Sequence, residues 1–83
     1  MSSAKEVSQE NRRNYVELGL NIAYYRKRAG LTQEQLAERA DISRSHLSAI
    51  EAPNIIRPFS LEILFDLANA LDVRPSKLLD FRD

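Results

Sequence analysis

The chain has 83 residues, enough for one small domain with a modest hydrophobic core, and we expect residues 1–83 to form that single domain. It has no cysteine and one histidine, which excludes a disulfide framework and a zinc site built from these residue types. Twelve basic and twelve acidic residues give zero net charge, which argues against a purely electrostatic, non-specific nucleic-acid binder.

Residues 1–13 are a polar N-terminal extension that lacks the apolar core of a signal peptide. No segment has the length and apolarity of a membrane span, so we expect a cytoplasmic protein without a membrane partner. The extension either lengthens the first helix or forms a mobile arm that touches DNA. Residues 1–30 carry six basic and three acidic groups, which favours this part as the phosphate-facing side. Alternatively, the basic run at 26–28 only stabilises a helix end.

The first helix is predicted at about residues 15–28. Leu18, Ile22 and Tyr25 recur at helical spacing along this stretch. Gly30 follows the last periodic residue, where it can adopt the left-handed conformation that ends a helix.

Residues 33–52 carry the pattern of a helix-turn-helix, in which two short helices cross at a steep angle. Leu36, Ala37 and Ala40 line one face of the first helix, and Leu47 and Ile50 line the inner face of the second. The small side chain at position 37 lets the second helix pass close to the first. Such a motif places the outer face of its second helix in the DNA major groove.

Capping residues predict where these two helices begin. Thr32 and Gln35 form a T-x-x-Q capping box, and Ser43 is placed to cap the second helix in the same way. A helical wheel then puts Ser45, Ser48, Ala49 and Ala52 opposite the apolar stripe, with Arg44 on the flank.

The segment after the motif reads APNIIRPF, and its two prolines predict a loop. A fourth helix is predicted to start after Ser60 and to run to about Leu71, and a fifth opens at Pro75. The apolar residues that we expect these two helices to bury are Leu61, Leu64, Phe65, Leu67, Ala68, Leu71, Leu78, Leu79 and Phe81. Five short helices without a strand pattern predict an all-α, five-helix orthogonal bundle.

Two segments of the sequence carry a family resemblance. The first begins at position 18 and reads L-G-x-x-I-x-x-Y-R-K-x-x-G-L-T-Q-E-Q-L-A-E-x-A-x-I-S-R-S-x-L-S-x-I-E. The second begins at position 60, in register with the first, and reads S-L-E-I-L-F-D-L-A-N-A-L-D-V. The chain resembles the Cro/phage-repressor family of transcriptional regulators, also called the xenobiotic-response-element type, over roughly residues 18–80. This resemblance implies a lambda-repressor-like DNA-binding domain that binds a pseudo-palindromic operator as a homodimer.

The resemblance also implies roles for individual residues. Gln33 matches a glutamine that contacts DNA phosphate and braces the recognition helix, with Thr32 beside it. Arg26 and Glu51 match a structural ion pair inside the fold. The matched DNA-contacting positions are Ser43, Arg44, Ser45 and Ser48.

The physical chemistry of these side chains suggests how they would act. Arg44 is the first base-reading candidate, because a guanidinium can bind guanine bidentately, although a phosphate contact is the alternative. Ser45 and Ser48 specify less, and Ala49 can pack on a thymine methyl group. His46 flanks the core and suits packing or a phosphate contact.

The sequence departs from the family pattern in three places, which limits how far the family's residue roles can be assigned to this chain. Asp41 stands where the turn usually has glycine, and Ala52 and Pro53 replace a polar residue and glycine. The following loop is about two residues longer, with Ile55 and Ile56 where polar residues are frequent. The phosphate-contact candidates left in this loop are Asn54 and Arg57. The two isoleucines either tuck against the fourth helix or offer a protein contact.

The sequence therefore predicts a sequence-specific DNA-binding regulator, with the restriction–modification controller proteins as the best-fitting subgroup. A phage-type repressor and an antitoxin or adaptor that uses the fold to bind protein are the alternatives. Helix five, Phe81 and the loop around Ile55 are candidates for the dimer interface, and RNA polymerase is a candidate partner. We expect no enzymatic activity and no cofactor or metal, because the sequence has no nucleophile-base pair, metal-ligand cluster or glycine-rich phosphate loop.

Overall fold

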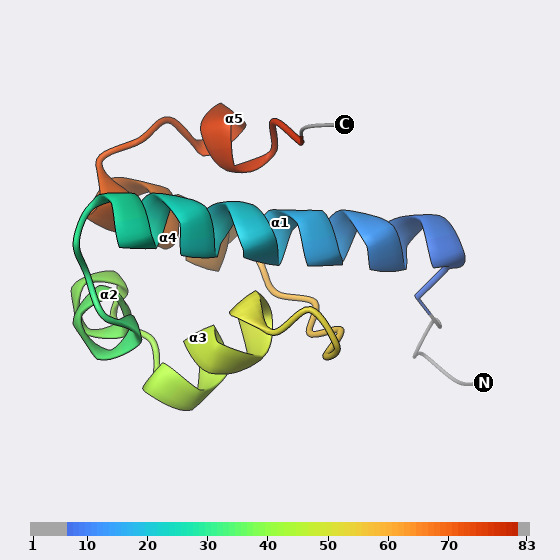
Figure 1. Cartoon of the computed structure of the whole chain (residues 1–83), viewed down its shortest axis with the longest axis horizontal. Coiled ribbons are helices and arrows are strands. Elements are labelled where there is room, and N and C mark those ends of the chain that lie inside the picture. The colour runs from blue at the N-terminus through green and yellow to red at the C-terminus, as the bar shows by residue number, and fades with distance from the viewer. Residues whose placement is uncertain (1–6, 82–83) are drawn as a thin grey trace.

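A computed structural model describes residues 7–81 and contains five helices and no strand within that range (Figure 1). The helices are α1 (Gln9–Arg28), α2 (Gln33–Ala40), α3 (Arg44–Glu51), α4 (Leu61–Leu71) and α5 (Pro75–Leu78). The expected all-α fold is confirmed. None of the helices in this part of the chain is long and apolar enough to cross a membrane.

The long helix α1 divides the molecule. Figure 1 shows α2 and α3 on one side of α1 and α5 on the other, with α4 passing behind it. Helix α2 packs against α3 and α4, and α3 also packs against α1. The helix-turn-helix is therefore held against both α1 and α4, so its orientation is set by the rest of the bundle.

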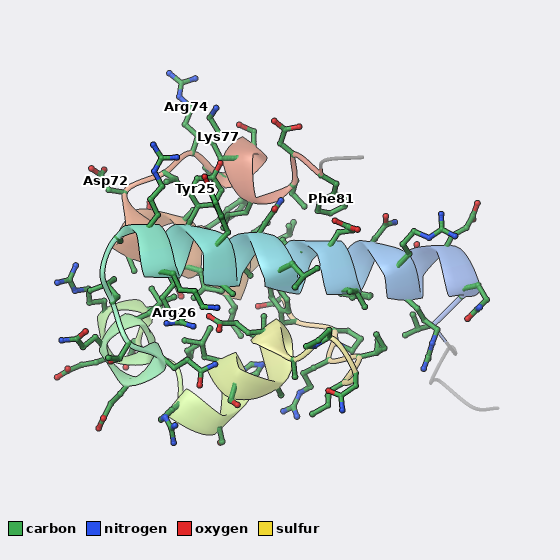
Figure 2. All side chains as sticks on the ribbon, viewed as in Figure 1. Tyr25, Arg26, Asp72, Arg74, Lys77 and Phe81 are labelled. Atoms are coloured by element: carbon green, nitrogen blue, oxygen red, sulfur yellow. The ribbon has the colours of Figure 1, made fainter. Side chains whose placement is uncertain are left out.

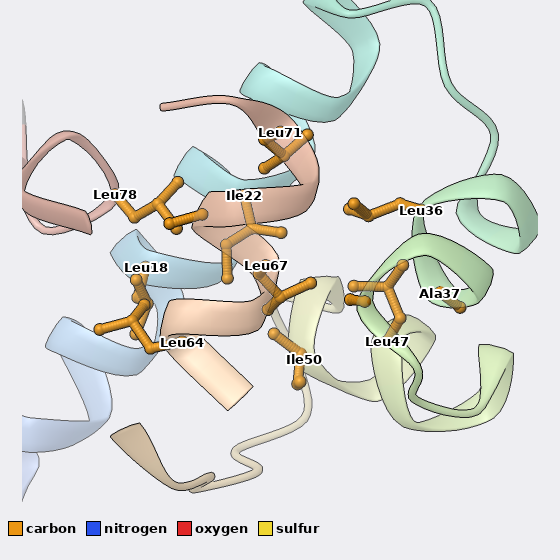
Figure 3. Packing of buried hydrophobic residues seen from close by; sticks show 12 residues of the cluster. Leu18, Ile22, Leu36, Ala37, Leu47, Ile50, Leu64, Leu67, Leu71 and Leu78 are labelled. Carbon is orange, nitrogen blue, oxygen red and sulfur yellow. The ribbon is translucent and has the colours of Figure 1, made fainter. Parts of the chain in front are cut away.

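The core lies where these helices meet and receives side chains from all five (Figure 3). It consists almost entirely of leucine, isoleucine and alanine, which fill the space without polar atoms that would need partners. The buried apolar residues are Leu18, Ile22, Leu36, Ala37, Ala40, Leu47, Ile50, Leu64, Leu67, Ala68, Leu71 and Leu78.

The first helix begins earlier than the apolar spacing predicts. It starts at Gln9 instead of about residue 15, because Ser8 caps it by accepting a hydrogen bond from the backbone N–H of Asn11 at 3.1 Å. The extension is thus helical over residues 9–13, and residues 1–6, which the arm hypothesis includes, lie outside the described residues. The first turns of α1 are polar and exposed, so they carry no apolar periodicity that could have revealed them.

The predicted burial is wrong at three apolar positions. Leu61 is 66% exposed and Phe65 is 43% exposed on α4, and Leu79 is 49% exposed after α5. The neighbouring helices cover only the stripe of α4 that contains Leu64, Leu67, Ala68 and Leu71, and the apolar face of this helix is wider than that stripe. Leu79 lies beyond the single turn of α5, so only Leu78 points into the core.

Candidate nucleic-acid interface

The chain turns from α2 to α3 at Asp41, which adopts a left-handed conformation with φ 59° and ψ 45°. The N–H groups of Asp41 and Ile42 donate to the carbonyl oxygens of Glu38 and Ala37 at 3.2 and 3.0 Å. These bonds satisfy carbonyl groups that the helix end would otherwise leave unpaired. Aspartate thus serves where glycine is usual, as the sequence led us to expect.

Both helices of the motif are capped by the predicted side chains, those of Thr32 and Ser43. Thr32 Oγ1 accepts from the N–H of Gln35 at 3.0 Å, and Gln35 Oε1 accepts from the N–H of Thr32 at 2.9 Å, which completes the predicted capping box. Ser43 Oγ accepts from the N–H of His46 at 3.0 Å and also lies 3.3 Å from Ser45 Oγ. The Ser43 hydroxyl therefore serves as the N-cap of α3.

A buried cluster around Glu51 ties the motif to α1. Arg26 donates two parallel hydrogen bonds to this carboxylate, from Nε to Oε2 at 2.8 Å and from Nη2 to Oε1 at 3.0 Å. Gln33 Nε2 donates to Oε1 at 3.0 Å as well, and Arg26 Nη1 donates to the carbonyl oxygen of Leu31 at 2.8 Å. The side chains of Arg26 and Glu51 are 11% and 5% exposed. The implied ion pair is thus present, and it joins α1, the start of α2 and the end of α3.

Gly19 allows α1 to approach α3 backbone to backbone. A Cβ at this position would overlap the carbonyl oxygen of Ile50 and would lie 3.4 Å from the Cα of Glu51. Only glycine fits here without a shift of one helix. The role of Gly19 was not predicted, although a glycine inside a helix costs about 1 kcal/mol against alanine and therefore signals a packing constraint.

Asn21 is a second residue with an unpredicted role. Its side chain is buried on α1 and donates to the carbonyl oxygens of Leu78 and Asp80, at 3.0 and 3.2 Å. These bonds hold α5 and the residues after it against α1, opposite the helix-turn-helix. The signal was a polar residue three positions after Leu18, on the side of the helix that carries the apolar stripe.

The outer face of α3 presents polar side chains to solvent. Its inward residues are Leu47, Ile50 and Glu51, all buried. Among the predicted DNA-contacting residues, Thr32, Ser43, Arg44, Ser45, Ser48, Asn54 and Arg57 are exposed, whereas Gln33, His46 and Ala49 are half-buried. Asn54 and Arg57 lie in the loop that follows α3, and Ile55 in the same loop is 48% exposed. Of the two loop isoleucines, only Ile56 is partly covered.

Two solved structures share this architecture. The restriction–modification controller protein C.AhdI from Aeromonas hydrophila matches with a TM-score of 0.74 and 33% identity, over 80% of this chain and 97% of that one. The hypothetical transcription factor NHTF from Neisseria matches with a TM-score of 0.77 and 26% identity, over 96% of this chain and 88% of that one. Both superpose on most of the bundle, not on the motif alone.

Relatives found by sequence agree with these structures. The HTH-type transcriptional regulator SinR of Bacillus subtilis is 38% identical over 63 residues, and SinR of Bacillus licheniformis is 36% identical over 66 residues. These matches cover 76% and 80% of this chain but only 56% and 59% of the SinR proteins. A helix-turn-helix family model matches residues 22–78, which confirms the expected family. The chain belongs to the helix-turn-helix family.

Proposed function

We propose that this protein binds double-stranded operator DNA as a homodimer and regulates transcription, with α3 in the major groove. The observation that carries the proposal is the division of α3 into two faces. Its inward face is buried and braced by the Arg26–Glu51 pair, whereas its outward face carries Arg44, Ser45 and Ser48 free of the core. A helix held in this way can present the same side chains to successive base pairs.

Arg44 is the proposed base-reading residue, because its exposed guanidinium stands in the first turn of α3, the part of a recognition helix that meets the base edges. Ser45 and Ser48 add hydrogen bonds, and Ala49 adds apolar contact. These groups read only a few base pairs, so DNA shape contributes to the choice of operator.

Phosphate contacts are proposed at the start of α2, at the start of α3 and in the loop after α3. The N–H groups of the first helical turns point outward and attract phosphate without needing net positive charge. Gln33 would serve there while its amide also holds Glu51. The side chains proposed for these contacts are Thr32, Gln33, Ser43, His46, Asn54 and Arg57.

A homodimer is proposed because one motif reads too few base pairs to select an operator, whereas two related by a twofold axis read both halves of a palindrome. The exposed apolar side chains of Leu61 and Phe65, which lie one turn apart on α4, are proposed as part of the surface for the second copy. We infer that this protein acts as a restriction–modification controller, since nearly the whole length of C.AhdI aligns with it. DNA as the ligand implies a cytoplasmic location, and a contact with RNA polymerase would accompany activation of transcription.

The proposal is tested by gel shift with purified protein, using the DNA upstream of its own gene and a scrambled duplex of equal length at two salt concentrations. We expect selective retardation that weakens as salt rises, because phosphate contacts release counterions. Arg44→Ala should lower operator affinity about 5- to 150-fold, the equivalent of about 1–3 kcal/mol. It should also reduce the difference in affinity between operator and scrambled DNA. Arg39→Ala, which removes an exposed charge from α2 outside the predicted contacts, is the matched control.

Two outcomes would contradict the proposal. Equal losses on operator and scrambled DNA in Arg44→Ala would remove the base-reading role of that residue. If the folded protein binds neither its upstream DNA nor any duplex selected from a random pool, the DNA-binding function is wrong and a protein-binding role replaces it.

A further inference from the structure

A hollow of about 520 Å³ opens between the last turn of α1 and the segment that joins α4 to α5. It lies on the side of α1 away from the helix-turn-helix. Figure 2 shows Tyr25, Arg74 and Lys77 on one side of α1, while Arg26 points to the other side, toward α2 and α3. The lining residues are Tyr25, Arg28, Ala29, Leu71, Asp72, Val73, Arg74 and Lys77.

The wall of the hollow is cationic. Three cationic side chains, those of Arg28, Arg74 and Lys77, line it together with a single carboxylate, that of Asp72, in a chain whose net charge is zero. None of the three cations lies within ion-pair distance of a carboxylate among residues 7–81, where Arg26 and Glu51 form the only such pair. The guanidinium of Arg28 donates to Tyr24 Oη at 3.2 Å, which helps to hold it in place. An anion in the hollow would therefore meet three positive groups and one negative group, none of which forms an ion pair within residues 7–81.

Neither the helix dipoles nor DNA binding accounts for this cluster. The dipole favours Arg28 in the last turn of α1, but it disfavours Arg74, which occupies the N-cap position of α5 and makes no side-chain cap bond. The proposed operator would lie against α3, on the other side of α1. The positions of Arg74 and Lys77 therefore call for a different ligand.

The remaining lining is apolar. Tyr25 and Val73 are partly buried and packed against the core, and Leu71 belongs to the core itself. The ring of Tyr25 meets that of Tyr24 edge to face, with centroids 5.0 Å apart. An aromatic and aliphatic floor beside cationic groups suits a ligand with a flat apolar part and a charged group.

We propose that this hollow binds a small organic anion, with a ring against Tyr25, Leu71 and Val73 and a phosphate or carboxylate group among Arg28, Arg74 and Lys77. The site does not depend on the proposed DNA-binding function, because none of its lining residues is among the side chains proposed above for DNA contacts, and Arg28, from the basic part expected to face phosphate, lines the hollow on the other side of α1 from α3 (Figure 2). If it binds a ligand of this class, the protein is a receptor for a small metabolite in addition to its proposed role in binding DNA.

The test uses phenyl phosphate, inorganic phosphate and phenol as probes, each titrated into the isotope-labelled full chain while backbone amide signals are followed by NMR. We expect phenyl phosphate to shift the signals of Ala29, Val73 and Lys77 in a saturable way, more tightly than either half of the molecule alone. Arg74→Ala should weaken this binding about tenfold, the loss typical of one hydrogen bond to a charged group. Arg39→Ala and Arg44→Ala should leave it unchanged, the second because Arg44 belongs to the DNA face.

Several results would overturn the proposal. Absence of saturable shifts up to about 10 mM phenyl phosphate, ten times a weak dissociation constant of about 1 mM, would show that the hollow is no site for this class. Equal affinity for inorganic phosphate would remove the role of the apolar floor, and shifts confined to α2 and α3 would place the anion on the DNA face. Because the Arg74 side chain is exposed and makes no described hydrogen bond or ion pair, and alanine keeps the backbone carbonyl that accepts from the N–H of Lys77, its replacement should leave the fold intact, which the unperturbed amide signals of the core will verify.

Discussion

Replacing Glu51 by alanine should strongly destabilise the protein, because it leaves the Arg26 guanidinium buried without its counter-charge. Both side chains of the pair are at least 89% buried, and two of the three hydrogen bonds that Arg26 makes go to this carboxylate. Breaking a buried pair from one side costs about 3–5 kcal/mol. A domain of this size has a total stability of about 4–12 kcal/mol, so the loss is a large share of it.

Urea unfolding followed by far-UV circular dichroism measures this loss. We expect the free energy of unfolding to fall by about 3–5 kcal/mol in Glu51→Ala, and the thermal midpoint to fall by at least about 12 °C. Glu38→Ala is the matched control, since it removes an exposed carboxylate from α2 and should change stability by less than about 0.5 kcal/mol.

A double variant distinguishes the buried charge from a simple loss of packing. Arg26→Met combined with Glu51→Leu removes both charges and keeps apolar volume, so it should be more stable than Glu51→Ala alone. A loss below about 1 kcal/mol in Glu51→Ala would refute the reasoning, because the pair would then behave like an exposed one. A double variant no more stable than Glu51→Ala would refute it too.

Gly19→Ala should lower stability by more than about 1 kcal/mol although alanine favours helices, because its methyl group would overlap the Ile50 carbonyl oxygen; unchanged urea unfolding would contradict this close approach. Asp41→Ala should be less stable than Asp41→Gly by about 1 kcal/mol, since alanine resists the left-handed backbone at this turn; equal unfolding midpoints would argue against that conformation. Leu61→Glu should dissociate the proposed dimer in sedimentation equilibrium without unfolding it, because an acidic group suits the first turn of α4; Leu20→Glu on α1 is the control, and an intact dimer in Leu61→Glu would exclude this surface.

The helix boundaries of the motif were predictable because local rules set them. The caps at Thr32 and Ser43 involve residues three positions apart, and Gly30 and Pro75 act through their own backbone. The start of α1 was missed because its polar first turns carry no apolar stripe. Sequence could reveal it only through the capping position of Ser8.

Features that depend on distant parts of the chain were less accessible. The pairing of Arg26 with Glu51 came from the family resemblance, because a helical wheel shows that a residue faces inward but not which partner it meets. The exposure of Leu61 and Phe65 depends on how much of α4 its neighbours cover, which no local pattern encodes. The contact of Gly19 with Ile50 likewise becomes visible only when α1 and α3 are placed together.

The separation of the two faces of α3 has a consequence for engineering. The residues that fix its orientation, Leu47, Ile50 and Glu51, are buried, while Arg44 and Ser48 touch solvent and support nothing in the core. Positions 44 and 48 can therefore be randomised together in a library with little change in the free energy of unfolding of the domain. If the outer face of α3 reads operator DNA as proposed, such a library would let new DNA targets be selected while the buried Glu51 cluster holds α3 against α1.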